Sequence, residues 1–352
     1  MSVMTIHSNL RDYTLHIQDD ASFIAGFSRF PQRLFVIDEN VWKLHGTGSL
    51  APLADSERII FSVSEERKNL DGVMEIYDRL MECSAKKNMT LISIGGGIIQ
   101  DITGFVASTL YRGLNWVFVP TTLLAQADSC IGSKTSLNYK RFKNLIGTFY
   151  PPAEVHIFSK VLQTLEKNDF LSGMGEVAKL HIMGGTDTIS SFTAALPALL
   201  GRDDAAILSA IHRSLMVKLS YMEGDEFDTG RRNLLNYGHC FGHALETVSD
   251  YAIPHGQAVV VGMLVANRIA VKRSLLSEAA SQRFAEQFLC SLLDFKLDLS
   301  RYSMAELITA MRQDKKRVGA GLVMVMVTDA IEMVKVDDVT PEEIEIAVQS
   351  FA

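Results

Sequence analysis

The segment MTLISIGGGIIQD, residues 89–101, decides the fold that this sequence predicts. It opens with apolar and β-branched residues that indicate a buried strand, and the strand runs into three glycines, Gly95–Gly97. A helical pattern follows over residues 98–110. A strand, a glycine turn and a helix in this order are typical of a βα unit in a mostly parallel sheet.

The glycine turn is a candidate phosphate-binding site. Backbone N–H groups at the start of a helix can approach a phosphate closely, and the helix dipole favours its negative charge. A tight turn that binds no ligand is the alternative. The pattern is not G-x-G-x-x-G, because Gln100 stands where the third glycine would be, so we do not expect the common Rossmann fingerprint.

The same alternation of strands and helices extends on both sides of this segment. Strands are predicted at residues 14–17, 33–38, 58–63 and 115–120, and a helix is predicted over residues 65–86. We therefore predict an α/β domain with a doubly wound, mostly parallel sheet that binds ligands at the carboxyl ends of its strands.

A second domain is predicted after Pro151-Pro152, where the pattern changes. The periodicity is mainly helical from about residue 162 to residue 314, so we predict a first domain at residues 1–152 and a mainly α-helical second domain at residues 153–352. Near the end, GLVMVMV predicts a short strand, and Thr340-Pro341 predicts the capped start of a last helix.

Composition excludes several classes of function. The chain has 352 residues and a formal net charge of −7 without a long basic block, which argues against nucleic acid as a partner. No apolar run is long enough to span a membrane, and the N-terminal stretch lacks the apolar core of a signal peptide. The four scattered cysteines predict free thiols in a reducing cytosol, and hence a cytoplasmic protein.

A histidine-rich segment, RRNLLNYGHCFGHALETVSDYAIPHG at residues 231–256, is a candidate metal site. His239 and His243 are four residues apart, so on a helix they share one face. His255 follows a proline and is expected to begin the next helix. Such a group of imidazoles recruits a divalent metal if a carboxylate joins it from elsewhere. Hydrogen-bonded core histidines are the alternative.

Glu176 is the candidate for that carboxylate. In GMGEVAKLHIM, Glu176 and Lys179 lie three apart and share a helix face among apolar neighbours. An idle carboxylate in such surroundings is costly unless it is paired or bound to metal. A surface ion pair is the alternative.

A cationic segment at residues 128–144 is a candidate site for a phosphorylated substrate. It contains Lys134, Lys140, Arg141 and Lys143 among hydroxyl and amide side chains, in what we expect to be a loop. Cations with hydrogen-bonding neighbours suit a phosphate group. A solvated lysine-rich loop is the alternative.

Several motifs together resemble the 3-dehydroquinate synthase family. GGGIIQDITGFVAS, VPTTLLAQADSCIGSKTSLN, KNLIGTFYPP, SGMGEVAK, GRRNLLNYGHCFGHALE, PHG and DKK occur in that family's order and rough spacing, from about Asp38 to Lys316. The resemblance implies a dehydroquinate synthase-like fold and a homodimeric phosphorus–oxygen lyase that depends on NAD and a divalent metal. It implies conversion of 3-deoxy-D-arabino-heptulosonate 7-phosphate to 3-dehydroquinate and phosphate, in the shikimate pathway, by oxidation, β-elimination, re-reduction and aldol cyclisation.

The resemblance also implies roles for individual residues. The metal, zinc or cobalt, would be bound by Glu176, His239 and His255, while His243 would handle protons beside the substrate. The other catalytic positions implied are Asp228, Lys134, Asn144, Arg232 and Asn236. The substrate positions implied are Arg112, Asp128, Lys134, Asn144, Lys179, Lys218, Arg232, Asn236, Lys315 and Lys316. The NAD positions implied are Asp38, Asn40, Glu65, Lys68, Gly96, Gly97, Ile98, Asp101, Thr121, Thr122, Lys143 and Thr164. In the family, the arginine matching Arg112 reaches across the dimer to the partner's site.

The sequence departs from the family pattern at a few positions. Ser133 replaces a glycine, residues 140–144 replace Pro-x-Gly-Lys-Asn, and Gln100 replaces a glycine. Asp228 stands where the family more often has a glutamate, so its shorter side chain would have to be met by a backbone shift or a water.

Three other classes of protein could share some of these motifs. A related sugar phosphate cyclase that makes 2-deoxy-scyllo-inosose or 2-epi-5-epi-valiolone shares the scaffold, but Arg232 and Asn236 are retained as in dehydroquinate synthases. A metal-dependent polyol dehydrogenase would have no use for cations such as Lys134 and Lys218, because a neutral polyol needs no phosphate clamp. A binding protein without activity would have lost metal ligands, and all of them are in place.

Overall fold

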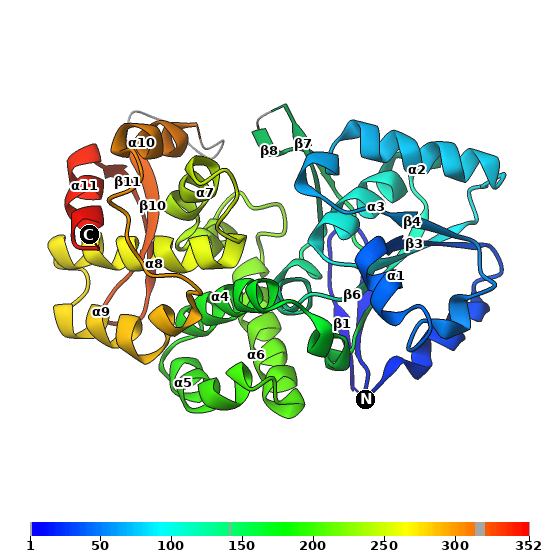
Figure 1. Ribbon diagram of the computed structural model, residues 1–352, viewed down its shortest axis with the longest axis horizontal. Coiled ribbons are helices and arrows are strands. Elements are labelled where there is room, and N and C mark those ends of the chain that lie inside the picture. The colour runs from blue at the N-terminus through cyan, green and yellow to red at the C-terminus, as the bar shows by residue number, and fades with distance from the viewer. Residues whose placement is uncertain (1, 141, 314–320, 352) are drawn as a thin grey trace. The chain divides into compact units, whose positions relative to one another are not determined.

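The computed structural model describes residues 2–140, 142–313 and 321–351. The chain divides into two compact units, unit 1 (Met1–Leu165) and unit 2 (Glu166–Ala352) (Figure 1). Unit 1 is built around a mostly parallel sheet and unit 2 is mainly helical, so the predicted fold class is confirmed. In the described part of the chain, no helix has the length and apolar character that a bilayer crossing requires.

Unit 1 contains a seven-stranded sheet with the strand order β1-β2-β9-β6-β5-β3-β4. Its strands are β1 (Ser2–Ile6), β2 (Tyr13–Ile17), β3 (Arg33–Asp38), β4 (Arg58–Phe61), β5 (Thr90–Gly95), β6 (Asn115–Pro120) and β9 (Glu154–Ile157). Its α-helices are α1 (Glu39–His45), α2 (Leu70–Glu82) and α3 (Gly97–Thr109). Every pairing is parallel except that of β1 with β2, and β5 is buried at all of its residues. Strands covered on both faces need continuous apolar sequence, so the apolar run at residues 89–94 correctly predicted a buried strand.

The register brings the ends of three central strands together. Ile37 at the end of β3 pairs with Ile94 of β5, and Gly95 pairs with Pro120 at the end of β6. The segments that follow these strands therefore leave the sheet at the same edge. Two of the glycines there are required by packing alone, because a Cβ on Gly95 would lie 2.3 Å from Ile99 and one on Gly96 would lie 2.9 Å from Thr122.

The cationic segment is not a loop, which corrects the expectation from the sequence. It begins in the π-helical segment η5 (Ala125–Ser129) and continues into a hairpin of β7 (Lys134–Tyr139) and β8 (Phe142–Phe149). Thr135 and Leu137 are buried, and a Cβ on Gly147 would lie 2.1 Å from the Thr135 carbonyl oxygen. The many lysines and amides obscured this alternation of buried and exposed residues.

The double proline does not end the first unit. Strand β9 follows Pro151-Pro152 and pairs in parallel with β2 and with β6, so it completes the sheet of unit 1. The division between the units falls after Leu165 for this reason.

Unit 2 is a helical assembly with one small hairpin. Its helices are α4 (Lys167–Met183), α5 (Thr186–Leu200), α6 (Asp204–Met222), α7 (His239–Val248), α8 (His255–Lys272), α9 (Glu278–Phe284), α10 (Met304–Arg312) and α11 (Pro341–Gln349), and its strands are β10 (Leu322–Val327) and β11 (Met333–Val339). The expected strand near the end and the capped last helix are confirmed, since Thr340 forms a capping box with Glu343.

Helix α8 is the centre of unit 2, where it appears in yellow in Figure 1, and it packs against α4 and α7. Glycines make both contacts close. A Cβ on Gly256 would lie 1.7 Å from the Ser172 carbonyl oxygen of α4, and one on Gly262 would lie 1.9 Å from the Gly238 carbonyl oxygen that precedes α7. These contacts fix the relative positions of the three helices that carry Glu176, His239 and His255.

Candidate functional site

Glu176 and two of the histidines converge in unit 2. Glu176 is 1% exposed, and its Oε1 lies 3.4 Å from His239 Nε2 and 3.2 Å from His255 Nε2. Lys179 Nζ lies 2.5 Å from its Oε2. The alternative of a surface ion pair is therefore wrong, because both members of the pair are buried.

The start of each helix aims its histidine into this cluster. His239 is the first residue of α7, after Gly238 in the left-handed region at φ 78°. A Cβ on Gly238 would lie 2.5 Å from the Val259 carbonyl oxygen, so this turn needs glycine. His255 is the first residue of α8, after Pro254, as the sequence predicted.

The cluster fits a divalent metal ion. Lys179 balances the charge of Glu176, but among the described residues neither carboxylate oxygen has a hydrogen bond of good geometry, which leaves Oε1 available to a metal ion. His239 Nδ1 lies 3.1 Å from the Tyr237 carbonyl oxygen, and His255 Nδ1 lies 3.0 Å from Glu246 Oε2. If each Nδ1 carries the proton, both Nε2 lone pairs face Glu176. One oxygen and two nitrogen ligands suit zinc or cobalt.

The pKa values in the cluster reflect this crowding of charge. Burial works against the ionised form of Glu176, but Lys179 and the two histidines outweigh it and hold the pKa well below its usual range. Burial, followed by the charge of Lys179, holds the pKa of His239 well below its usual range, so its lone pair is available. Burial is outweighed at His255, where Glu246 and Glu176 raise the pKa to about 10. A proton and a metal ion therefore compete for His255.

Glu246 is a residue that the sequence reasoning missed. It lies on α7, is 4% exposed, and accepts the hydrogen bond that orients the His255 ring. A carboxylate behind a metal-binding histidine fixes its tautomer and raises its basicity. Its place three residues after His243, on the same helix face, was a signal that could have been used.

His243 stays in the same cluster. Its ring centroid lies 5.3 Å from that of His239 and 5.6 Å from that of His255. The shared helix face of His239 and His243 is therefore confirmed. That His243 carries protons and does not bind the metal stays a prediction.

A second group of potential ligands, in unit 1, does not have the geometry of a metal site. His16, Glu154 and His156 bring their ligand atoms within 4.8 Å of one another. However, the rings of His16 and His156 are stacked 4.6 Å apart and nearly parallel, so one ion could not lie in the plane of both. Both nitrogens of His156 are also hydrogen bonded, to Glu154 at 2.7 Å and to Gln18 at 3.1 Å.

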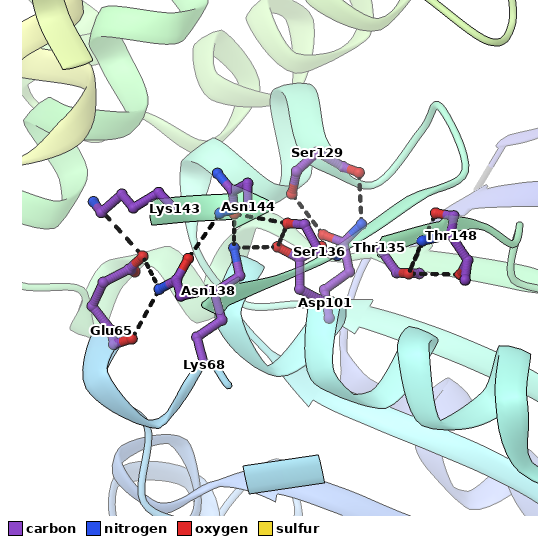
Figure 2. Close-up of polar contacts among 11 residues, drawn as sticks. Glu65, Lys68, Asp101, Ser129, Thr135, Ser136, Asn138, Lys143, Asn144 and Thr148 are labelled. Carbon is purple, nitrogen blue, oxygen red and sulfur yellow. Dashed lines mark hydrogen bonds and ion pairs between the residues drawn. The ribbon is translucent and has the colours of Figure 1, made fainter. Parts of the chain in front are cut away.

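A polar network in unit 1 connects many of the predicted cofactor and substrate residues (Figure 2). Its centre is Asp101, in the first turns of α3, which lies 2.5 Å from Lys68 Nζ and accepts hydrogen bonds from Ser136 N and Oγ at 3.0 and 2.9 Å. Burial raises the pKa of Asp101 against the opposing charge of Lys68. Asn144 Oδ1 accepts from Lys68 at 2.6 Å and lies 2.8 Å from Ser136 Oγ, whose single proton can serve either Asn144 or Asp101. The network therefore fixes hairpin β7–β8 to the start of α3.

A second part of the network involves Glu65. Asn138 Nδ2 donates to Glu65 Oε1 at 2.9 Å, and Lys143 Nζ lies 3.7 Å from the same oxygen (Figure 2). Asn138 Oδ1 in turn accepts from the backbone N–H of Asn144 at 2.9 Å. Glu65, Lys68, Asp101, Lys143 and Asn144, which the family resemblance implied as cofactor or substrate residues, therefore form one connected group.

The glycine turn retains the features of a phosphate site. The N-cap of α3 is Gly96, which has no side chain, so no cap side chain accepts a hydrogen bond from the first N–H groups of the helix. A Cβ on Gly97 would have no neighbour nearer than Ser129 Oγ at 3.9 Å, so packing does not require glycine there. An open position at a helix N-terminus is suited to a phosphate. Ile98 belongs to the same first turn.

The remaining predicted cofactor residues lie near the same edge of the sheet. Asp38 caps α1 by accepting from Asn40 N at 2.8 Å. Thr121 is buried just after β6, and Thr122 Oγ1 accepts from Ala125 N at 3.2 Å. Thr164 contacts α1 through His45 Nε2 at 2.9 Å.

The remaining predicted substrate residues are divided between the units. Lys218 and Arg232 of unit 2 are 7% and 3% exposed, which is unusual for cations. Asn236 ends the 3-10 helix η7 (Arg231–Asn236). Arg112 of unit 1 has φ 58° in a strained turn after α3, and Asp128 lies in η5. Lys315 and Lys316 lie outside the described residues.

Two family models together match most of the chain. The model described as 3-dehydroquinate synthase N-terminal matches residues 58–172, and that described as 3-dehydroquinate synthase C-terminal matches residues 173–317. A 3-dehydroquinate synthase of Geotalea uraniireducens is 40% identical over 259 residues, 73% of this chain and 71% of the relative. Another, of Clostridium tetani, is 34% identical over 319 residues, 90% of this chain and 82% of the relative.

Solved structures share the fold. A 2-deoxy-scyllo-inosose synthase complexed with carbaglucose-6-phosphate, NAD+ and Co2+ has a TM-score of 0.88 at 22% identity over 100% of both chains. The 2-epi-5-epi-valiolone synthase of Streptomyces hygroscopicus subsp. jinggangensis, with NAD+ and Zn2+ bound, has a TM-score of 0.86 at 25% identity over 100% of this chain and 98% of its own. A probable glycerol dehydrogenase of Sinorhizobium meliloti has a TM-score of 0.64 at 14% identity over 95% of each chain.

Proposed function

Since this chain belongs to the 3-dehydroquinate synthase family, we propose that it converts 3-deoxy-D-arabino-heptulosonate 7-phosphate to 3-dehydroquinate and inorganic phosphate. The observation that carries the proposal is the buried carboxylate of Glu176 with two imidazole nitrogens directed at it. The enzyme would be a phosphorus–oxygen lyase of the shikimate pathway. Homodimerisation and a cytoplasmic location are parts of the proposal that rest on the family resemblance.

The residues of each unit support a different cofactor. Glu176, His239 and His255 would hold a zinc or cobalt ion in unit 2. The open Gly97 position and the Asp101 network, with Asp38 and the threonines after β6, would hold NAD in unit 1. When bound, the metal supplies Lewis acidity at a substrate hydroxyl, and NAD supplies a reversible hydride acceptor, so no net oxidation occurs.

Buried cations would bind the anionic groups of the substrate. Lys179, Lys218 and Arg232 are each less than a tenth exposed. A leaving phosphate gains negative charge in the transition state, and cations held at fixed positions would stabilise that charge. A neutral polyol would need no such cations, which disfavours a polyol dehydrogenase in spite of the shared fold.

His243 and Asp228 would handle protons. His243 lies beside His239 and His255, so it would transfer protons near a substrate bound at the metal. Asn236 and Asn144 would orient substrate oxygen atoms, as expected for amides that donate and accept.

The proposal is tested by product analysis. The purified protein with NAD and zinc should release inorganic phosphate from the heptulosonate phosphate without accumulating NADH. Turnover of only glucose 6-phosphate or sedoheptulose 7-phosphate would support the alternative of a related sugar phosphate cyclase. Steady production of NADH from glycerol would support a dehydrogenase.

A further inference from the structure

The turn between α6 and η7 is built around one buried carboxylate, that of Asp225. Its Oδ1 accepts hydrogen bonds from Thr229 N at 2.8 Å and Thr229 Oγ1 at 3.0 Å. Its Oδ2 accepts from Gly230 N at 2.8 Å and from Arg232 N at 2.8 Å. The side chain is only 9% exposed. A single carboxylate therefore satisfies three backbone N–H groups within four consecutive residues.

Asp228 lies inside this turn in an unusual conformation. Its φ of 60° is in the left-handed region, which few residues other than glycine adopt and which aspartate tolerates better than most. Its N–H donates to the Asp225 carbonyl oxygen at 3.3 Å, and its own carbonyl oxygen accepts from Asn233 Nδ2 at 2.9 Å. Strained residues persist where the surrounding structure fixes them, and they cluster at functional sites.

Arg232 is fixed by the same carboxylate. Its backbone N–H is bound to Asp225, and its guanidinium donates to the Glu226 carbonyl oxygen. It belongs to the first turn of η7, which ends at Asn236. Burial works against the charged form of Asp225, but the bonds from the backbone N–H groups of Thr229, Arg232 and Gly230 hold its pKa at about 2. The carboxylate therefore stays ionised in any physiological buffer.

We propose that Asp225 is a positioning residue that holds Asp228 and Arg232 in the geometry the reaction needs. The inference rests on the proposed function, since both positioned residues act in that reaction. It assigns a role to a residue that touches neither substrate nor cofactor.

The test compares Asp225→Ala, in the turn after α6, with a matched control at the other end of α6. Asp203 caps the start of α6 by accepting from Ala206 N at 2.9 Å, so Asp203→Ala also removes an aspartate bound to backbone. We expect Asp225→Ala to lower kcat/KM about 100-fold, through both kcat and KM, because small displacements of catalytic groups have effects of this size. Bound metal and NAD affinity should be unchanged. Asp203→Ala should keep the wild-type kcat and KM.

Two milder variants guard against a protein that does not fold. Thr229→Val removes only one of the four bonds to Asp225 and should lower kcat/KM several-fold. Asn233→Ala removes the bond to the Asp228 carbonyl oxygen and should lower kcat more than it raises KM. Wild-type kinetics in Asp225→Ala, or in both milder variants, would overturn the proposal.

A measurement without substrate separates this inference from the proposed function. In Asp225→Asn, amide hydrogen exchange over residues 226–233 should accelerate at least tenfold, while Asp203→Ala leaves it unchanged. If the wild-type protein turns over none of the sugar phosphates, the proposed function fails and exchange alone decides whether Asp225 anchors the turn. Unchanged exchange in Asp225→Asn would reject the anchoring role.

Discussion

At the scale of single residues, the metal cluster depends on Glu176. The carboxylate is 1% exposed, and the nearby charge of Lys179 stabilises its ionised form. Three side chains surround this carboxylate. Lys179 comes from the same helix, and His239 and His255 come from the starts of two other helices.

The first prediction concerns the ligands themselves. Glu176→Gln removes the charge that holds the metal, so we expect loss of bound zinc and of activity. His255→Ala should behave in the same way. Zinc content by mass spectrometry provides the measurement, and His212→Ala, an exposed histidine on α6, is the control. Stoichiometric zinc in either ligand variant would refute the assignment.

The second prediction concerns Glu246. Glu246→Gln keeps the size of the side chain but weakens the hydrogen bond to His255 Nδ1. We expect metal affinity to fall about 10- to 100-fold, the usual range for such supporting carboxylates. Competition with a chelator of known affinity measures it. An unchanged affinity would show that Glu246 does not tune the site.

At the scale of secondary-structure elements, close helix contacts and one hairpin place the functional groups. Helix α8 approaches α4 and the turn before α7 only because Gly256 and Gly262 have no side chains. In unit 1, hairpin β7–β8 is joined to Asp101 of α3 through Ser136, and to Lys68 through Asn144. Contacts between these elements therefore bring together residues that are far apart in the sequence.

The third prediction tests the helix contact. Gly256→Ala would force a Cβ to 1.7 Å from the Ser172 carbonyl oxygen, so the helices must separate next to His255. We expect a loss of about 1–3 kcal/mol in the free energy of unfolding, together with weaker metal binding. Urea unfolding and zinc titration measure the two effects. Gly26→Ala, whose Cβ would lie 3.6 Å from its nearest neighbour, is the control. Wild-type stability in Gly256→Ala would contradict the packing argument.

The fourth prediction concerns Lys134, the exposed first residue of β7. Lys134→Ala should raise the KM for the sugar phosphate and slow the reaction, because a cation for the substrate is lost, while NAD affinity changes little. Lys140→Ala, which removes an exposed cation just beyond the same strand, should have no effect. If NAD binding alone weakens in Lys134→Ala, the lysine serves the cofactor.

At the scale of the whole molecule, the predicted sites are divided between the two units. The proposed metal ligands all lie in unit 2, and the proposed NAD residues all lie in unit 1. Each unit has its own core, formed by the buried sheet in one and by α8 and its neighbours in the other.

The fifth prediction follows from this division. Removing the metal with a chelator should lower the Tm, because a ligand that binds only the folded state stabilises it. The chelated protein should still bind NAD with an affinity within about twofold of the original, as measured by fluorescence titration. Loss of NAD binding together with the metal would show that the two sites are not independent.

The sequence by itself determined the fold class and most of the candidate residues. Continuous apolar strands and the glycine turn predicted a parallel sheet, because strands buried on both faces leave a strong pattern. The motifs around Glu176, His239 and His255 indicated, through the family resemblance, that these three residues form one metal site. A local sequence pattern is sufficient to predict a feature that depends on a single strand, turn or helix.

Only the tertiary structure decided how these residues meet. The hairpin within residues 128–149 was hidden by its polar composition, and its stability depends on contacts with Asp101, Lys68 and Glu65. The roles of Glu246 and Asp225 arise from hydrogen bonds to His255 and to the backbone of a turn. Such bonds depend on the direction of side chains in three dimensions, which no periodicity in the sequence records.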